Sequence, residues 1–89
     1  MPEDFRPCIR ALIYPVQFER DPLDGVDRVV RAALAEGVLG APPERCLALL
    51  RSALASDEPL AQLIPQDHPE ATIRRFLAEV ERRLSRDAE

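Results

Sequence analysis

Apolar residues recur along this chain at the spacing of one helix face, and prolines and glycines separate the segments that carry them. In the first segment, apolar side chains at positions 5, 8, 9, 12 and 13 form a single helical stripe. The same pattern predicts helices over about 4–14, 22–37, 43–55, 57–64 and 68–85. No long stretch alternates apolar and polar residues as a strand would. We therefore expect an all-α fold, with residues 1–89 forming one compact bundle of four to five short helices.

Prolines and aspartates mark where the first helices begin and end. Pro15 should end the first helix, because a proline disfavours helical backbone at the residue before it. Residues 16–18 are then predicted to be a short extended connector, held to the core by the ring of Phe18. Asp21 and Pro22 are typical of a helix start, as N-cap and first-turn residue. The buried stripe of that second helix is predicted to be Val26, Val29, Val30, Ala33 and Leu34.

The second half of the chain predicts a central helix and a capped C-terminal helix. Residues 43–55 are apolar over more than one stripe, so this segment is expected at the centre of the core. Asp67 and Glu70 have the spacing of a capping box, in which each carboxylate accepts the backbone N–H of the other residue. They predict the start of the last helix.

Composition and length limit the classes of function that this chain can have, before any motif is considered. Of 89 residues, 46% are apolar and 31% are charged, as in folded globular domains. So small a domain has little room for a ligand cleft of about 300–1,000 Å³, and we expect neither an enzyme nor a small-molecule binder. The net charge is −4, from 16 acidic residues against 12 arginines, with no lysine. This balance disfavours nucleic acid as a partner and favours a basic protein.

Cysteine content and the N-terminus bear on the cellular compartment. Cys8 and Cys46 are too few for a metal site or a disulfide framework. Both lie in apolar stripes, so we expect buried thiols, with a disulfide or a reactive surface thiol as the alternatives. The N-terminus lacks the basic start of a secretory signal, and no apolar run approaches the length of a membrane span. We expect a cytoplasmic protein that does not bind membranes.

Four carboxylates cluster where the second helix begins, at Glu19, Asp21, Asp24 and Asp27. A bound cation is one explanation, but the spacing of a calcium loop is absent. Stabilisation of the helix N-terminus is a second explanation, and contact with a basic partner is a third. The only histidine, His68, lies in a capping turn that we expect to be solvated, and nothing places it beside a nucleophile. We therefore expect no catalytic, cofactor-binding or metal-binding residues.

The C-terminal helix suggests an alternative function, because it carries five arginines between positions 74 and 86. A small helical regulator could bind nucleic acid, or another protein, through this arginine-rich face. Acidic residues lie three or four positions from these arginines, however, and residues 71–89 have a net charge of only +1. No aromatic platform interleaves with the arginines. A solvated face of ion pairs is the simpler interpretation.

Five stretches of the chain carry a family resemblance. They are residues 10–14 (RALIY), 18–21 (FERD), 23–25 (LDG), 54–60 (LASDEPL) and 73–77 (IRRFL). Together they resemble the small all-helical immunity proteins of bacterial contact-dependent growth inhibition systems. The resemblance implies a cytoplasmic protein that binds the C-terminal toxin domain of its cognate partner and neutralises it. Many such toxins are nucleases with a basic cleft, which an acidic surface would cover.

Acidic residues are the expected contacts with such a toxin domain, in a one-to-one complex without cofactor. The first expected patch is the cluster that begins at Glu19 and ends at Asp27, and the second is the next acidic turn of the chain. The predicted contact residues are Glu19, Asp21, Asp24, Asp27, Asp57 and Glu58. Their expected role is pairing with lysines and arginines of the toxin.

Overall fold

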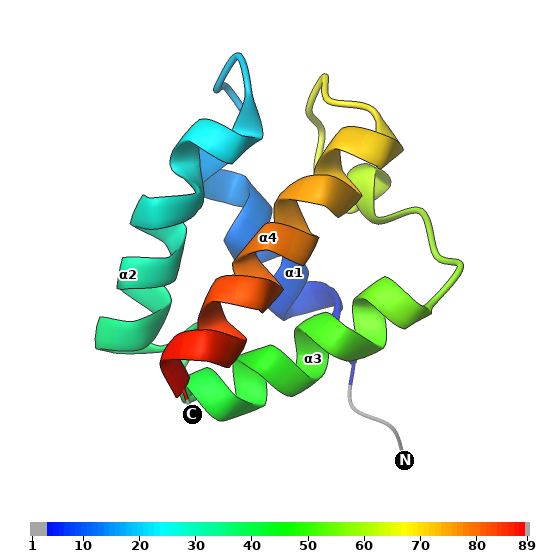
Figure 1. Ribbon diagram of the computed structural model, residues 1–89. Coiled ribbons are helices and arrows are strands. Elements are labelled where there is room, and N and C mark those ends of the chain that lie inside the picture. The colour runs from blue at the N-terminus through cyan, green and yellow to red at the C-terminus, as the bar shows by residue number, and fades with distance from the viewer. Residues whose placement is uncertain (1–3, 89) are drawn as a thin grey trace.

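The computed structural model describes residues 4–88, and this part of the chain consists of helices joined by short connections (Figure 1). The α-helices are α1 (Arg6–Ile13), α2 (Val26–Glu36), α3 (Pro43–Ala55) and α4 (Glu70–Ala88). Short 3-10 helices lie between them: η1 (Tyr14–Val16), η2 (Pro22–Gly25) and η3 (Leu60–Gln62). Within residues 4–88, the β-type pairing is limited to one isolated bridge between Val38 and Ala41. The predicted all-α fold class is confirmed.

The longest helix, α4, is the centre of the packing, whereas the apolar pattern predicts residues 43–55 in that position. It lies in front of α1 in Figure 1 and packs against α2, α3, η2 and η3. Its inner side chains have no exposed surface: Ile73, Phe76, Leu77, Val80 and Leu84. Complete burial of a large apolar side chain contributes about 1.5–3 kcal/mol, so α4 supplies much of the core. No polar or charged residue is buried in the part of the chain that the structure describes.

The first connection differs from its prediction, because the chain stays helical through Pro15. α1 does end before Pro15, at Ile13, but Tyr14 has φ −50° and ψ −46°, and the chain continues through the proline as η1. Residues 16–18 are not extended either, since Gln17 has φ −61° and ψ −28°. This tight turn buries Val16 completely and leaves Phe18 91% exposed. The prediction that Phe18 holds the connector to the core is wrong.

The helix predicted over 22–37 is divided into η2 and α2. Four of the five predicted stripe residues of α2 are buried, whereas Leu34 is 37% exposed. Gly37 ends the helix with φ +74°, a backbone conformation that a residue with a side chain rarely adopts. Its N–H donates to the carbonyl of Ala33 at 2.9 Å, and the following turn is closed between Val38 and Ala41.

The second half of the chain combines one helix at its predicted bounds with a connection that was not predicted. α3 spans the residues expected from the pattern, 43–55. Of the helix predicted over 57–64, only η3 is helical, since prolines at 59 and 65 leave few residues between them. The predicted capping box is also wrong. The carboxylate of Glu70 accepts the backbone N–H groups of Leu60 at 2.9 Å and Ala61 at 2.8 Å.

Candidate protein-binding surface

The acidic segment at the start of η2 is shaped by Asp21 and Pro22. Asp21 has extended backbone, with φ −127° and ψ 114°, and its side chain accepts the N–H of Leu23 at 3.0 Å. Pro22 is buried at the first position of η2. Asp21 is therefore a helix cap whose side chain remains exposed to solvent.

Two neighbouring acids already have arginine partners within the chain. Glu19 pairs with Nη2 of Arg28 at 3.2 Å, and the same nitrogen donates to the carbonyl of Pro15 at 3.0 Å. Asp27 pairs with Arg83 of α4, which joins the start of α2 to the C-terminal half of α4. These contacts are partly solvated: Arg28 and Glu19 are 60% and 37% exposed, and Asp27 and Arg83 are 66% and 31% exposed. They can therefore exchange for an external cation at small cost.

Asp24 differs from the other acids of this segment. Its side chain is exposed and makes no hydrogen bond or ion pair with residues 4–88. Asp24 is thus the carboxylate of this cluster that an external cation can approach without displacing an internal partner.

The second predicted acidic patch is separate from the first. Glu58 holds Arg6 through two hydrogen bonds, from Nε at 2.8 Å and from Nη2 at 2.5 Å. Asp57 is exposed and has no such contact within the described residues. The connection that carries both lies across α4 from α2 in Figure 1 (lime green). The six predicted acids therefore divide into two surfaces, and the structure does not bring them together.

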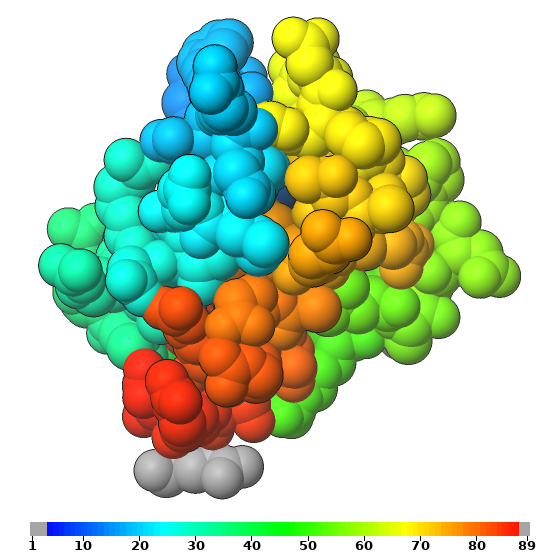
Figure 2. All heavy atoms as spheres, turned by 45° about the horizontal axis from the view of Figure 1, so that its top comes forward, coloured from blue at the N-terminus to red at the C-terminus, as the bar shows by residue number. Residues whose placement is uncertain are grey.

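Three exposed aromatic and aliphatic side chains, one of which directly precedes Glu19, were missed by the sequence reasoning. Phe18 is 91% exposed, Tyr14 is 68% exposed and Leu39 is 72% exposed. Figure 2 shows the segment around residue 20 (blue to cyan) as a projection, beside a second projection around residue 66 (yellow). The available signal was Phe18 itself, a lone aromatic residue followed directly by Glu19, Arg20 and Asp21.

A shallow apolar groove lies on the outer side of α1. Its volume is about 400 Å³, and Tyr14 is one of its walls. The lining residues are Pro7, Arg10, Ala11, Tyr14, Leu39 and Ile64. Arg10 is held against the rim by a hydrogen bond from its Nε to the carbonyl of Leu63 at 3.3 Å. The lining residues of this groove are apolar apart from Arg10, a composition that suits contact with another protein.

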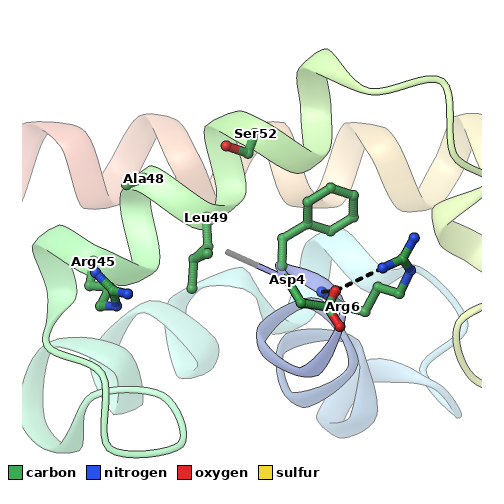
Figure 3. Close-up of a pocket in the computed structure, with 7 residues that line it drawn as sticks. Asp4, Arg6, Arg45, Ala48, Leu49 and Ser52 are labelled. Atoms are coloured by element: carbon green, nitrogen blue, oxygen red, sulfur yellow. Dashed lines mark hydrogen bonds and ion pairs between the residues drawn. The ribbon is translucent and has the colours of Figure 1, made fainter. Parts of the chain in front are cut away.

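A larger cavity, of about 580 Å³, lies between the start of α1 and α3 (Figure 3), so the fold has more room for a cleft than its length predicts. Arg6 there donates to Asp4 from both its backbone N–H and its Nη1, each at 3.0 Å. The backbone hydrogen bond is the main reason why the pKa of Asp4 is lowered. Ser52 also lines the cavity, but no histidine does. Figure 3 shows the Ser52 hydroxyl directed away from the Asp4–Arg6 pair, so this cavity has no evident nucleophile and base.

Arg74, the first arginine of the C-terminal helix, is used inside the fold. Its guanidinium donates to the carbonyls of Leu54, Ser56 and Glu58 at 3.2, 3.0 and 2.8 Å. It also pairs with Glu70 at 2.7 Å. These bonds satisfy carbonyls at and beyond the end of α3, which have no partner within that helix.

Further along α4, arginines pair with acids as the sequence spacing indicates. Arg82 and Arg83 both contact Glu79, at 2.5 and 3.3 Å, and Arg83 also contacts Asp27. Arg75 is exposed without a hydrogen bond or ion pair to residues 4–88. The arginine-rich face is mainly a network of internal ion pairs.

His68 is less solvated than predicted. Its Nε2 is buried and has no hydrogen-bond partner within the described residues, while its backbone N–H donates to Gln66 at 2.6 Å.

No group of three or more His, Cys, Asp or Glu side chains in residues 4–88 is placed to hold a metal ion. In the same range, no helix combines the length and the apolar character needed to cross a membrane.

Comparison of the chain with models of known protein families returns no match, and neither do comparisons with curated proteins and with solved structures. The surface around Phe18 and Asp24 must therefore be interpreted from its own chemistry.

Proposed function

We propose that this chain is an immunity protein that binds the toxin domain of a contact-dependent growth inhibition system one to one and neutralises it. The proposal is supported by the resemblance of the five sequence stretches and by one structural observation. That observation is the 91% exposure of Phe18 beside an acidic turn. Binding without a catalytic step fits a surface of this kind, and no cofactor enters the proposal.

Phe18 is the proposed centre of the interface. An aromatic ring is a large, rigid group that gains most when it leaves water, and aromatic residues are enriched at binding hot spots. The ring is not used in the core, whereas the neighbouring Val16 is completely buried. Tyr14 and the groove that it lines would extend the apolar contact along α1.

The acids around Phe18 favour a basic partner. Asp24 has no internal partner among residues 4–88, so it would pair directly with a lysine or arginine of the toxin. Glu19 and Asp27 would first exchange Arg28 and Arg83. We therefore expect Asp24 to contribute more than either of them. A nuclease toxin is the favoured target, because its basic substrate cleft would complement this surface.

The experiment is co-expression of the chain with the toxin domain encoded immediately upstream of its gene, with cell survival and co-purification as readouts. Rescue of growth together with a stable one-to-one complex is the expected result. Cell death despite folded, soluble protein would rule out the immunity function.

Affinity measurements on the same pair test the proposed surface. Phe18→Ser and Asp24→Asn should each weaken binding at least about tenfold, as expected for hot-spot and charge-pair contacts. Glu44→Gln is the matched control, because this exposed acid in the first turn of α3 loses the same charge. Asp57→Asn tests the second patch separately. Unchanged affinity in the Phe18→Ser, Asp24→Asn double variant would remove this surface from the proposal.

A further inference from the structure

The two cysteines meet inside the protein, although 38 positions separate them along the chain. Cys8 lies on α1 and Cys46 on α3, and these helices pack against each other. Both residues are free thiols, with exposures of 4% and 0%. Their sulfur atoms are 3.6 Å apart and share a hydrogen bond. Neither thiol has a part in the proposed binding surface.

We propose that Cys8 and Cys46 form an oxidation site at which hydrogen peroxide creates an intramolecular disulfide that joins α1 to α3. In the first step, the thiolate of one cysteine attacks one peroxide oxygen, the O–O bond breaks, hydroxide departs, and that cysteine becomes a sulfenic acid. In the second step, the sulfur of the other cysteine attacks the sulfenic sulfur, and the S–OH oxygen leaves as water after taking up a proton. Overall, two thiols and one peroxide give one disulfide and two waters, and the peroxide is the two-electron oxidant.

The geometry favours this product over its competitors. A disulfide requires a sulfur–sulfur distance of about 2.05 Å, so the two atoms must approach by about 1.5 Å from their separation of 3.6 Å. Rotation of the side chains with a small shift of the eight-residue α1 can supply that movement. Burial keeps thiols of other molecules away, and the neighbouring thiol is placed to capture a sulfenic acid before further oxidation.

The two thiols share one hydrogen bond, and either sulfur could be its donor. The hydrogen bond lowers the pKa of the thiol that accepts it, whereas burial raises the pKa of both thiols. The thiolate is the nucleophile in this chemistry, so the accepting sulfur attacks the peroxide and the donating sulfur resolves the sulfenic acid.

A disulfide between Cys8 and Cys46 would strongly constrain the unfolded chain. It would close a loop across 38 positions, and the chain-entropy account gives larger stabilisation for longer loops. For a domain of this size, the corresponding rise in Tm is about 10 °C or more. The disulfide would also fix α1, whose outer side carries the apolar groove, to the core.

The test uses the purified full chain, reduced, freed of reductant and then treated with hydrogen peroxide near neutral pH. We expect the intact mass to fall by two hydrogen atoms, a peptide containing Cys8 to be linked to one containing Cys46, and Tm to rise. Excess dithiothreitol should reverse all three changes. Cys8→Ala and Cys46→Ala, treated identically, are the controls and should show no increase in Tm.

Three results would overturn the proposal. One is a gain of oxygen atoms on a single cysteine in place of the link, and another is a covalent dimer. The third is a folded protein whose two thiols both remain free after peroxide and react with a maleimide once it is unfolded. The intact mass, the linked peptides and Tm are all measured on the wild-type chain. The test therefore remains decisive even if an alanine variant fails to fold.

Discussion

Arg74 and Glu70 lie one helical turn apart on α4, and together they hold the connection between α3 and α4. Nε of Arg74 donates to Oε2 of Glu70 at 2.7 Å. The remaining guanidinium donors reach carbonyls at and after the end of α3. The carboxylate of Glu70 receives the N–H groups of Leu60 and Ala61 at the start of η3. This pair therefore organises a connection with little helical structure of its own.

Replacement of Arg74 should destabilise the protein through this connection. Arg74→Gln leaves the carbonyls of Leu54, Ser56 and Glu58 without their charged donor. Hydrogen bonds to charged groups contribute about 1.5–3 kcal/mol each, and water can replace part of them at a half-buried site. We expect a loss of about 2–3 kcal/mol in the free energy of unfolding, measured by urea denaturation. Arg75→Gln is the matched control, and a similar loss there would contradict the assignment.

Glu70 should make stability depend on pH in the acidic range. Burial alone would raise its pKa, but hydrogen bonds from Ala61, Leu60 and Arg74 outweigh burial and lower the pKa from 4.5. A carboxyl whose pKa is lower in the folded state stabilises the protein above its unfolded pKa, and this stabilisation is lost as pH falls through the folded pKa.

The matching variant is Glu70→Gln, which cannot ionise. The wild-type chain should be more stable than this variant by about 1 kcal/mol near pH 7, since charge-assisted hydrogen bonds are the stronger ones. Urea unfolding over a series of pH values should show this difference shrinking below about pH 4.5. A difference that stays constant down to about pH 2 would contradict the role given to Glu70. Glu44→Gln corrects for the loss of one acidic group.

Phe18 and Phe76 should differ strongly in how much their truncation lowers stability. Phe76 is completely buried, so Phe76→Ala should cost about 3–5 kcal/mol. Phe18 is 91% exposed, and Phe18→Ser should change stability by no more than about 0.5 kcal/mol. The stabilities of the two variants can be compared by thermal unfolding, with circular dichroism as the probe. A large loss of stability in Phe18→Ser would mean that the ring packs against the protein in solution.

Two glycines in the turn after α2, Gly37 and Gly40, should differ in how well they tolerate replacement by alanine. Both have positive φ, +74° for Gly37 and +81° for Gly40, so alanine at either position carries backbone strain of about 1 kcal/mol. A Cβ on Gly37 would also collide with the carbonyl oxygen of Ala41, whereas one on Gly40 would meet nothing within 4 Å. Gly37→Ala should therefore lower Tm clearly more than Gly40→Ala. Equal effects would show that the turn relaxes without cost.

The sequence was most informative about the bounds of α3. The apolar pattern of 43–55 gave the bounds of α3 directly, because its first turn begins with a proline and its last precedes a polar break. The pattern was misleading at Val16 and Phe18. Two apolar residues two positions apart fit an extended connector, but the 3-10 turn at Pro15 directs only the valine inward.

The candidate surface was harder to predict than the fold. Acidic residues of one cluster look equivalent in sequence, yet Asp21 caps η2, Asp27 pairs with Arg83 and Asp24 has no internal partner in the described range. These differences depend on contacts with residues up to 56 positions away. Likewise, the spacing of Asp67 and Glu70 could not reveal that η3 would offer Glu70 two better donors.

The exposure of Phe18 also gives this protein a built-in place for an optical reporter. The chain has no tryptophan, so Phe18→Trp would introduce the sole indole fluorophore. At a position 91% exposed, its emission in the free protein would be that of an indole in water. Any partner that covers the turn would shift the emission to shorter wavelength, without background from the rest of the fold. Binding and unfolding could then be followed separately in one cuvette, since only binding would change the surroundings of this ring.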